Sequence, residues 1–260
     1  TAADKTGGEY TTGVTTAGTP GSSGAYTQIV VAASAPTLFY QCSVHAGMGG
    51  QANTNSTLGS STFDGTLQSV TKVNATSGFS IVKWTSGGTG YETVGHGLGV
   101  KPDIVITKAR TTSNNWFVYT DVIDGTNDFL ELNSTNAAAD AESYSIVPPT
   151  STVFGTDGAF VSQNTNVPMI AYVFSSVEGY SKIGKYTGNA STDGTFVFCG
   201  FKPSVIILKK TSSTDNWTLF DIKRDIDNPM HRRLRANIAD AEATTLSSSQ
   251  DQIDFLSNGF

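Results

Sequence analysis

Hydrophobic residues in this chain fall into short runs that are separated by stretches rich in Gly, Ser, Thr and Asn. Several runs alternate hydrophobic and polar residues with the period of two that a half-buried β-strand shows. We find no segment with the 3.6-residue hydrophobic period of a long helix. The pattern therefore predicts an all-β protein, with strands at Tyr26–Ala33, Thr37–Cys42, Phe79–Trp84, Phe129–Asn133 and Val167–Phe174, and at most a short helix at Asn136–Glu142.

One hydrophobic pattern occurs twice in the chain. The first copy is Gly99–Lys108 followed by Asn115–Tyr119, and the second is Gly200–Lys209 followed by Asn216–Phe220. The offset between the copies is 101 residues throughout, without a gap. A match of this length at one fixed offset indicates an internal repeat.

Each copy of the repeat is typical of a β-hairpin. A Lys-Pro pair fixes the entry, because proline holds φ at about −65° and favours extended geometry in the residue before it. The β-branched run that follows does not alternate, which is typical of a strand buried on both faces. Polar turn residues then lead into a return strand that starts at Trp116 or Trp217. We expect the two hairpins to superpose as parts of two similar β-units.

The two tryptophans of the hairpins permit two interpretations. Trp116 and Trp217 could be binding residues, as platforms on which a ligand stacks. Packing inside a β-sandwich core is favoured, because large aromatic side chains serve mostly as packing residues.

The repeat divides the chain into parts. Residues 79–180 form the first β-repeat and residues 181–260 the second, each expected to be of β-sandwich type. Residues 51–78 are polar, so we predict a linker with one short strand at Leu67–Val73. The second repeat stops before any counterpart of Met169–Phe174, which suggests that the numbered chain is a segment, or a mature core, of something longer.

Composition narrows the class of protein. Of 260 residues, 27 are Gly and 15% are charged, which is typical of loop-rich, exposed all-β proteins. A formal charge of −6 without a basic tract argues against nucleic acid as the main partner.

We find no apolar run near the roughly 20 residues of a membrane span, and no signal peptide at the N-terminus. Cys42 and Cys199 are the two cysteines, too few for a disulfide scaffold.

Cys42, His45 and Met48 stand three residues apart, directly after a predicted strand. A thiolate, an imidazole and a thioether on one tight loop can face a single soft metal ion. With a second imidazole they form a blue-copper site, in which Met is the weak axial ligand. The stretch resembles the C-terminal ligand loop of cupredoxins. The resemblance implies that residues 1–50 form a cupredoxin-like half-sandwich and that Cys42, His45 and Met48 are the metal ligands.

Cupredoxins carry their second histidine ligand upstream of this loop. This chain has no histidine upstream of His45, because the other two, His96 and His231, lie in the repeats. A β-sandwich also needs about 100 residues, twice the length of this segment. We therefore expect a vestigial site without copper, in which Cys42 ends a strand and His45 and Met48 turn toward it. In the alternative interpretation, Cys42 is a small buried apolar residue and Met48 fills a gap.

Several further motifs resemble a repeated, tail-fibre-like domain in structural proteins of marine tailed phages. They are Gly95–Gly99, Glu178–Lys182, Tyr186–Asn189, Gly200–Pro203 and Asp254–Phe260, together with the two tryptophan hairpins. The stretch Tyr40–Gly50 also looks like part of a marine phage virion protein. The resemblance covers most of the chain and implies a virion component, and it brings no catalytic motif.

The expected function is that of a structural component of a phage virion, such as a tail fibre, a capsid decoration or another surface module. Its expected partners are other virion proteins, further copies of itself and a host-surface glycan, and we expect no enzymatic activity. The first alternative is a copper-binding electron-transfer protein of cupredoxin type. The second is a glycan-binding or glycan-cleaving protein. Cleavage would need two carboxylates at a defined separation, and the available acids are Asp121, Asp124, Asp128 and Glu131.

Two other features favour a structural interpretation. His96 lies between glycines, with Glu92 as the only carboxylate close by in the sequence, so we predict a loop residue rather than a base or a metal ligand. The basic cluster Met230–Arg235 is interpreted as a solvated face or a subunit contact.

Overall fold

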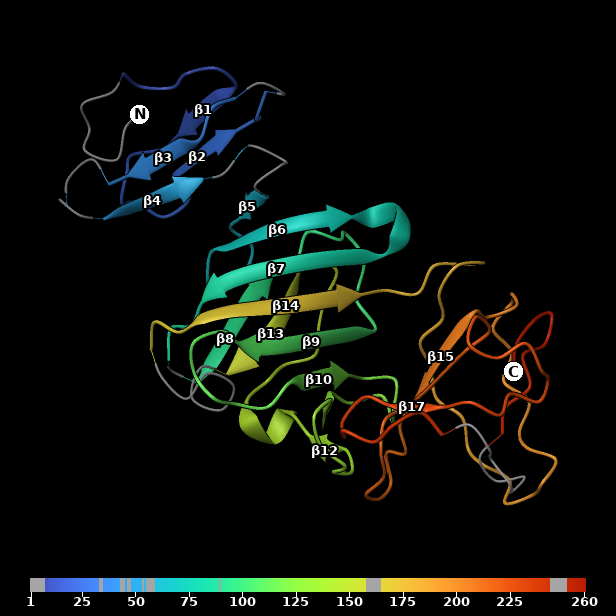
Figure 1. Ribbon diagram of the computed structural model, residues 1–260. Coiled ribbons are helices and arrows are strands. Elements are labelled where there is room, and N and C mark those ends of the chain that lie inside the picture. The colour runs from blue at the N-terminus through green and yellow to red at the C-terminus, as the bar shows by residue number, and fades with distance from the viewer. Residues whose placement is uncertain are drawn as a thin grey trace.

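The computed structural model describes residues 8–32, 35–42, 45, 48–52, 54, 59–88, 90–157, 165–243 and 252–260. These residues form short strands and two single turns of 3-10 helix, which confirms the all-β fold class. No helix in this described part of the chain is long and apolar enough to cross a membrane. Figure 1 shows an N-terminal pair of hairpins, a large central sheet and a C-terminal unit along the chain.

The N-terminal segment consists of two antiparallel hairpins, β1 with β2 and β3 with β4. It touches the central sheet through an edge-to-face contact between Tyr40 and Phe63, with ring centroids 5.4 Å apart. Gln68 Nε2 also donates a hydrogen bond to Gln51 O at 2.6 Å. The likeness to half a cupredoxin sandwich stays a prediction. The strands are β1 (Val14–Ala17), β2 (Tyr26–Ile29), β3 (Leu38–Gln41) and β4 (Gly49–Ala52).

The central element is an eight-stranded sheet in the order β12-β11-β10-β9-β14-β7-β6-β5. Every pair of neighbours in it is antiparallel. It contains the first tryptophan hairpin, β9 with β10. The strands are β5 (Ser60–Thr62), β6 (Ser69–Asn74), β7 (Phe79–Thr85), β9 (Ile104–Ala109), β10 (Phe117–Thr120), β11 (Asp128–Glu131), β12 (Ala139–Asp140) and β14 (Pro168–Phe174).

The linker predicted over residues 51–78 is part of this sheet, so that prediction needs correction. β6 pairs with β7 along its whole length, and β5 pairs with β6. The inward positions of β6 are occupied by the polar residues Ser69 and Thr71, which are buried. Ser69 Oγ satisfies its hydrogen bonding by donating to Gly95 O at 2.7 Å. Because the buried side chains are hydroxyl groups, the strand has the composition of a linker.

The core of the first repeat lies between the large sheet and a second, two-stranded layer. That layer is β8 (Tyr91–Gly95) paired with β13 (Val153–Asp157). Trp84 of the large sheet meets Phe154 of the small one edge to face at 5.5 Å. Both side chains belong to a cluster of buried hydrophobic residues that fills the space between the layers. The first repeat is therefore a two-layer β-structure.

The outer face of the large sheet is half-exposed and apolar. Along β9 the inward residues are buried, while Ile104, Ile106 and Lys108 on the outer face are half-buried. The prediction of a strand fully buried on both faces is therefore wrong for β9. β14 shows the same alternation, with Ile170 and Tyr172 pointing outward.

The second repeat contains a three-stranded sheet of β15 (Val205–Leu208), β16 (Thr218–Asp221) and β17 (Leu234–Arg235). In the first repeat Val105 pairs with Tyr119. In the second repeat Ile206 pairs with Phe220, the same two positions at the 101-residue offset. The two hairpins thus share one register, as the repeat predicts.

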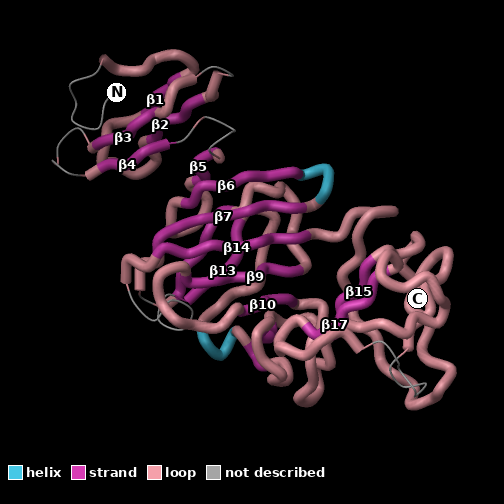
Figure 2. Tube along the Cα trace, in the orientation of Figure 1, coloured by secondary structure: helices cyan, strands magenta, loops and turns pink. Residues whose placement is uncertain are grey.

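Much of the second repeat is loop. Figure 2 shows long pink segments around β15 and β17. Residues 182–188, which correspond in the repeat to the segment of β7, contain no strand. The short helix expected at Asn136–Glu142 is replaced by β12 and the 3-10 turn η2 (Glu142–Tyr144). The other 3-10 turn, η1 (Ala75–Ser77), joins β6 to β7.

Candidate functional site

Cys42 follows the end of β3, and His45 turns toward it as the cupredoxin resemblance predicts. The Cys42 Sγ to His45 Nδ1 distance is 3.4 Å, and the His45 N–H donates to the same sulfur at 3.3 Å. Cys42 N–H donates to Met48 O at 2.7 Å, which closes the loop. Met48 itself is 59% exposed. Ser43, Val44, Ala46 and Gly47 lie outside the described residues.

The thiol and imidazole fit a shared metal ion in part. Two donors on one tetrahedral metal lie about 3.5 Å apart, so the Cys42–His45 distance suits a common metal as well as an S–H···N contact. The second imidazole of a blue-copper site is not supplied by either remaining histidine. His96 is buried with both ring nitrogens in hydrogen bonds, and His231 pairs with Asp227 in the second repeat. The residues therefore do not complete a cupredoxin ligand set.

His96 is a structural residue of the first repeat. Its Nδ1 accepts a hydrogen bond from Leu98 N–H at 3.2 Å, which places the ring proton on Nε2, where it is donated to Thr150 O at 3.2 Å. Its backbone also accepts from Ser80 Oγ and donates to Thr152 O. Burial lowers the pKa of this imidazole, so the ring stays neutral. These bonds join the glycine-rich loop to the segment before β13.

Trp217 is buried, and its neighbours belong to the first repeat. The side chain is 8% exposed and packs on Val118 and Leu130, with Ile104 and Ile106 beside them. Its Nε1–H donates to Glu131 O at 2.9 Å. The packing interpretation is correct for Trp217, although the packing joins two repeats rather than filling one core.

Polar contacts hold the turn of the Trp217 hairpin (Val205–Asp221) against the loop after β11. Asp215 N–H donates to Thr135 O at 2.9 Å, and Lys209 Nζ reaches the same oxygen at 3.3 Å. Ala138 N–H donates to Thr211 O at 2.9 Å. In each of these contacts the first repeat contributes backbone atoms. The hydrogen bonds between the repeats therefore depend on the path of that loop rather than on its side chains.

Trp116 takes a different place from Trp217. Its indole is half-buried on the outer face of the large sheet and stacks on Tyr172, with centroids 6.3 Å apart and planes 19° apart. It does not fill the core between the layers. Ligand binding at Trp116 and Trp217 stays a prediction.

A pair of asparagines fixes the turn end of each hairpin. Asn133 Oδ1 accepts from Trp116 N–H at 2.9 Å, and Asn133 Nδ2 donates to Asn115 Oδ1 at 3.0 Å. In the second repeat, Asn237 makes both bonds, to Trp217 N–H at 2.9 Å and to Asn216 Oδ1 at 2.9 Å. We call these four residues the asparagine frames. Each frame ties the start of the tryptophan strand to the end of the next strand.

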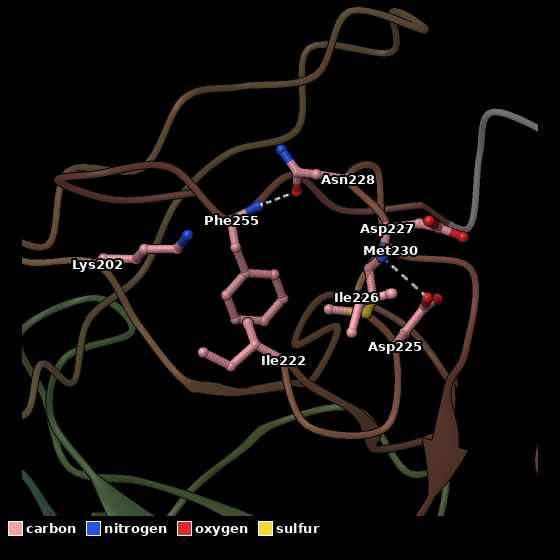
Figure 3. Close-up of a pocket in the computed structure, with 8 residues that line it drawn as sticks. All are labelled: Lys202, Ile222, Asp225, Ile226, Asp227, Asn228, Met230 and Phe255. Carbon is pink, nitrogen blue, oxygen red and sulfur yellow. Dashed lines mark hydrogen bonds between the residues drawn. The ribbon is translucent and has the colours of Figure 1, made fainter.

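A pocket in the second repeat was not anticipated from the sequence. Its volume is about 310 Å³, and Ile222, Met230 and Phe255 form its apolar side. Figure 3 shows Lys202 on one side of Phe255 and Asp225 on the other side of the pocket. The pocket lies over the small hydrophobic cluster of the second repeat, which contains both Met230 and Phe255.

Asp225, Asp227 and His231 form, among the described residues, a group of potential metal ligands whose donor atoms lie within 4.8 Å of one another. Both oxygens of Asp225 already accept backbone hydrogen bonds, from Asp227 at 3.2 Å and from His231 at 2.7 Å. Burial raises the pKa of Asp225, but these bonds outweigh it and hold the pKa below its ordinary value. The spacing of two acids and a histidine within seven residues was the available sequence signal.

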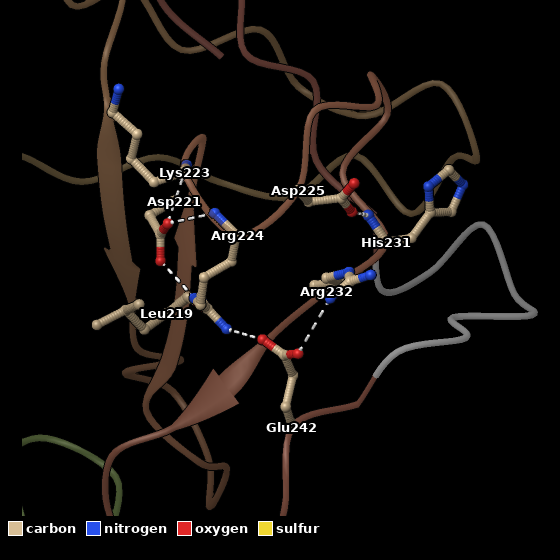
Figure 4. A network of polar contacts seen from close by, with 8 residues as sticks. All are labelled: Leu219, Asp221, Lys223, Arg224, Asp225, His231, Arg232 and Glu242. Carbon is tan, nitrogen blue, oxygen red and sulfur yellow. Dashed lines mark hydrogen bonds and ion pairs between the residues drawn. The ribbon is translucent and has the colours of Figure 1, made fainter.

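A network of charged side chains lies next to this loop, as Figure 4 shows. Arg224 Nε bonds Asp221 at 2.5 Å, and the other side of the guanidinium meets Glu242 at 2.5 Å. Arg232 reaches the same Glu242 at 3.6 Å. In the predicted basic cluster Met230–Arg235, Arg232 is thus paired with Glu242 and Arg235 with Asp240, so its charge is partly neutralised within the unit.

The acids considered for glycan cleavage mainly stabilise loops. Asp121 pairs with Lys101, and Glu131 accepts hydrogen bonds from Asn115 at 2.6 Å and Asn136 at 2.8 Å. Asp124 accepts from Thr126.

Asp128 differs from the other acids, because it is buried and its Oδ2 has no hydrogen-bond partner among the described residues. Burial, and then the charges of Asp124, Asp140 and Glu142, raise its pKa. One acid with a raised pKa is a weak sign of catalysis, because structural carboxylates shift in the same way.

Comparison with known proteins gives one match. The model of a domain of unknown function, DUF7483, matches residues 51–260. No curated protein and no solved structure matches the chain. The matched range begins at the segment predicted as a linker, which agrees with the place of β5 and β6 in the large sheet.

Proposed function

The chain belongs to the DUF7483 family, and we propose that it is a structural component of a phage virion, exposed on the surface as part of a tail fibre or a capsid decoration. The proposal starts from the resemblance of several sequence motifs to those of marine phage structural proteins. It does not depend on a catalytic site.

The observation that supports this proposal best is the way the repeats join. Trp217 of the second repeat closes the outer sheet face of the first through apolar contacts and a backbone hydrogen bond. A module whose units dock through sheet faces can extend by adding further units, which suits a protein that builds a surface assembly. Three of the four candidate acids, Asp121, Asp124 and Glu131, are engaged by neighbouring side chains, which suits a structural role better than turnover.

The test is to locate the protein in particles. An antibody against the purified chain should label intact virions of the phage that encodes it, and peptides covering residues 51–260 should appear in the mass spectrum of purified virions. Labelling of infected cells without any label on purified particles would contradict the proposal.

Copper binding is the second candidate, favoured by the 3.4 Å separation of Cys42 Sγ and His45 Nδ1. Since the ligand set lacks a second imidazole, the expected site is a thiolate and imidazole pair that holds Cu(I), a soft ion. The purified chain should then retain close to one copper per chain after dialysis.

A matched pair of variants tests this candidate. Cys42→Ser should abolish copper retention, whereas Cys199→Ser, which changes a thiol in the second repeat, should leave it unchanged. Equal copper content in the two variants would show that the metal is held elsewhere.

A further inference from the structure

Equivalent outer faces of the two repeats differ in what covers them. In the first repeat the outer residues of the hairpin and the next strand are Ile104, Ile106, Val118 and Leu130, which we call the repeat-1 face. Their counterparts in the second repeat, read from the strand registers, are Val205, Ile207, Leu219 and Leu234, which we call the repeat-2 face.

The repeat-1 face is covered by Trp217. Val118 and Leu130 are 1% and 5% exposed, and both isoleucines of β9 pack against the same cluster. On the repeat-2 face, Val205 is 56% exposed, Ile207 is 55% exposed and Leu234 is 36% exposed. The second repeat therefore presents to solvent the surface that the first repeat buries.

The sequence of β15 is that of a covered strand. Val205–Leu208 has large apolar residues on both faces, but only the inner one, with Ile206, is buried in a core. A contiguous exposed apolar face marks an interaction site in soluble proteins. The repeat-1 face is the equivalent surface, and the group that binds it is a tryptophan hairpin.

We propose that the repeat-2 face binds the Trp116 hairpin (Ile104–Thr120) of a second copy of this chain, as the repeat-1 face binds the Trp217 hairpin within one chain. The partner is argued from the internal interface, since each chain carries a second hairpin of the same register. The inference goes beyond the virion proposal and does not rest on it.

The Trp116 hairpin is built like the one that already docks. Its asparagine frame holds the tryptophan strand in the same way as in the second repeat. Trp116 is half-buried, with Tyr172 stacked on it, so part of the indole remains exposed for a partner. The loop after β11 in the first repeat makes its hydrogen bonds to the docked hairpin with backbone atoms, and its Leu132 and Ala138 side chains add apolar contact. The loop after Asn237 differs in sequence from the loop after Asn133, but its backbone atoms can make the same kind of hydrogen bonds to a docked hairpin.

Charge also suits this pairing. Arg110 is exposed at the turn of the Trp116 hairpin. Asp240 lies on the loop after Asn237 in the second repeat, where it pairs with Arg235 at 3.6 Å and its side chain stays 64% exposed. In the interface within one chain, the turn of the Trp217 hairpin approaches the loop after Asn133, which is the equivalent loop of the first repeat. A guanidinium at the turn would therefore approach a carboxylate on the loop, which favours association.

The proposed interface joins two different surfaces. Such a heterologous contact makes chains associate head to tail, so that they form a ring or an open series. This property separates it from a symmetric dimer in which one patch meets itself.

Sedimentation velocity of the full chain over a range of concentrations tests the proposal. The wild-type chain should associate, and Ile207→Asp and Trp116→Ala should each weaken association by about 30-fold or more, the effect of losing a buried aromatic anchor or its pocket. Ile226→Asp is the matched control, because Ile226 is 95% exposed on a loop outside the face. This control should associate like the wild type, and the circular dichroism of all variants should stay native.

A mixing experiment separates the head-to-tail interface from other arrangements. Trp116→Ala keeps an intact repeat-2 face, and Ile207→Asp keeps an intact Trp116. An equimolar mixture should therefore form one-to-one dimers that grow no further, although each variant alone stays monomeric.

Three outcomes would overturn the proposal. The first is a monomeric wild-type chain at all concentrations, and the second is a mixture that stays monomeric. The third is Trp116→Ala associating like the wild type, which would indicate a symmetric contact. If that variant also lost retention on a polysaccharide column, Trp116 would be a glycan platform instead.

Discussion

The imidazole of His96 is the buried group whose protonation should affect stability most directly. Its pKa is lowered in the folded chain from its ordinary value of 6.5, mainly by burial. The unfolded chain therefore binds a proton at pH values where the folded chain does not. The free energy of unfolding should fall as the pH drops below 6.5 toward the folded pKa, by at most about 1.4 kcal/mol per pH unit from this group.

Replacing the residue by His96→Gln tests this linkage. The amide can still donate to Thr150 O but cannot take up a proton, so the variant should lose stability less steeply between pH 7.5 and 5.5. Urea unfolding at three pH values measures both slopes. Equal slopes for the two proteins would show that His96 does not carry the pH dependence.

Trp217 should matter more to stability than Trp116, because it is buried at the junction of the repeats. Trp217→Ala should cost about 3–5 kcal/mol, whereas the half-buried Trp116→Ala should cost less. Trp217→Phe keeps most of the packing but removes the bond to Glu131 O, which should cost about 1 kcal/mol. Chemical unfolding of the three variants ranks the losses, and equal losses for the two alanine variants would contradict this account.

At the scale of elements, the asparagine frames explain why two hairpins of different sequence keep one geometry. Each frame satisfies the N–H of the tryptophan and links two strands. Asn133→Ala and Asn237→Ala should therefore destabilise the chain by similar amounts, about 1 kcal/mol each. Thermal unfolding compares them, and a loss confined to one variant would show that the frames are not equivalent.

The hairpins could be predicted from the sequence because their signals are local. The Lys-Pro entry, the β-branched run and the polar turn lie within one short stretch of chain. The strand predicted at Leu67–Val73 matches β6, but its place inside the large sheet could not be predicted, because the buried Ser69 and Thr71 are polar and Ser69 bonds Gly95 O, far along the chain. The short helix predicted at Asn136–Glu142 does not form, because Ala139–Asp140 pairs as a strand with β11.

The candidate site was predictable to a similar extent. Cys42 and His45 are neighbours in sequence, so their approach follows from one tight loop. The docking of Trp217 on Val118 and Leu130 joins residues about a hundred positions apart. A hydrophobic pattern states that a strand face is covered, but it does not state which distant side chain covers it.

At the scale of the whole molecule, the contacts that join the described N-terminal hairpins to the rest are mainly those of Tyr40 with Phe63 and Gln68, and of Gln51 with Ser61 and Gln68. Removing residues 1–50 should therefore change the unfolding free energy of the repeats by less than about 0.5 kcal/mol, the usual effect of a surface change. All three tryptophans, at 84, 116 and 217, lie in the repeats. Tryptophan fluorescence thus reports their unfolding alone, and a large loss of stability would show that the hairpins support the sheet.

The two repeats differ in one loop whose length has changed without moving the strands. Val118 pairs with Leu130 in the first repeat, and Leu219 pairs with Leu234 in the second, so the second connection is three residues longer. The asparagine frame closes it in the same way. Protein engineers seek such a position, where foreign peptides can be grafted while the scaffold stays in register. Ile226, which is 95% exposed in this connection, therefore marks a display site on this fold.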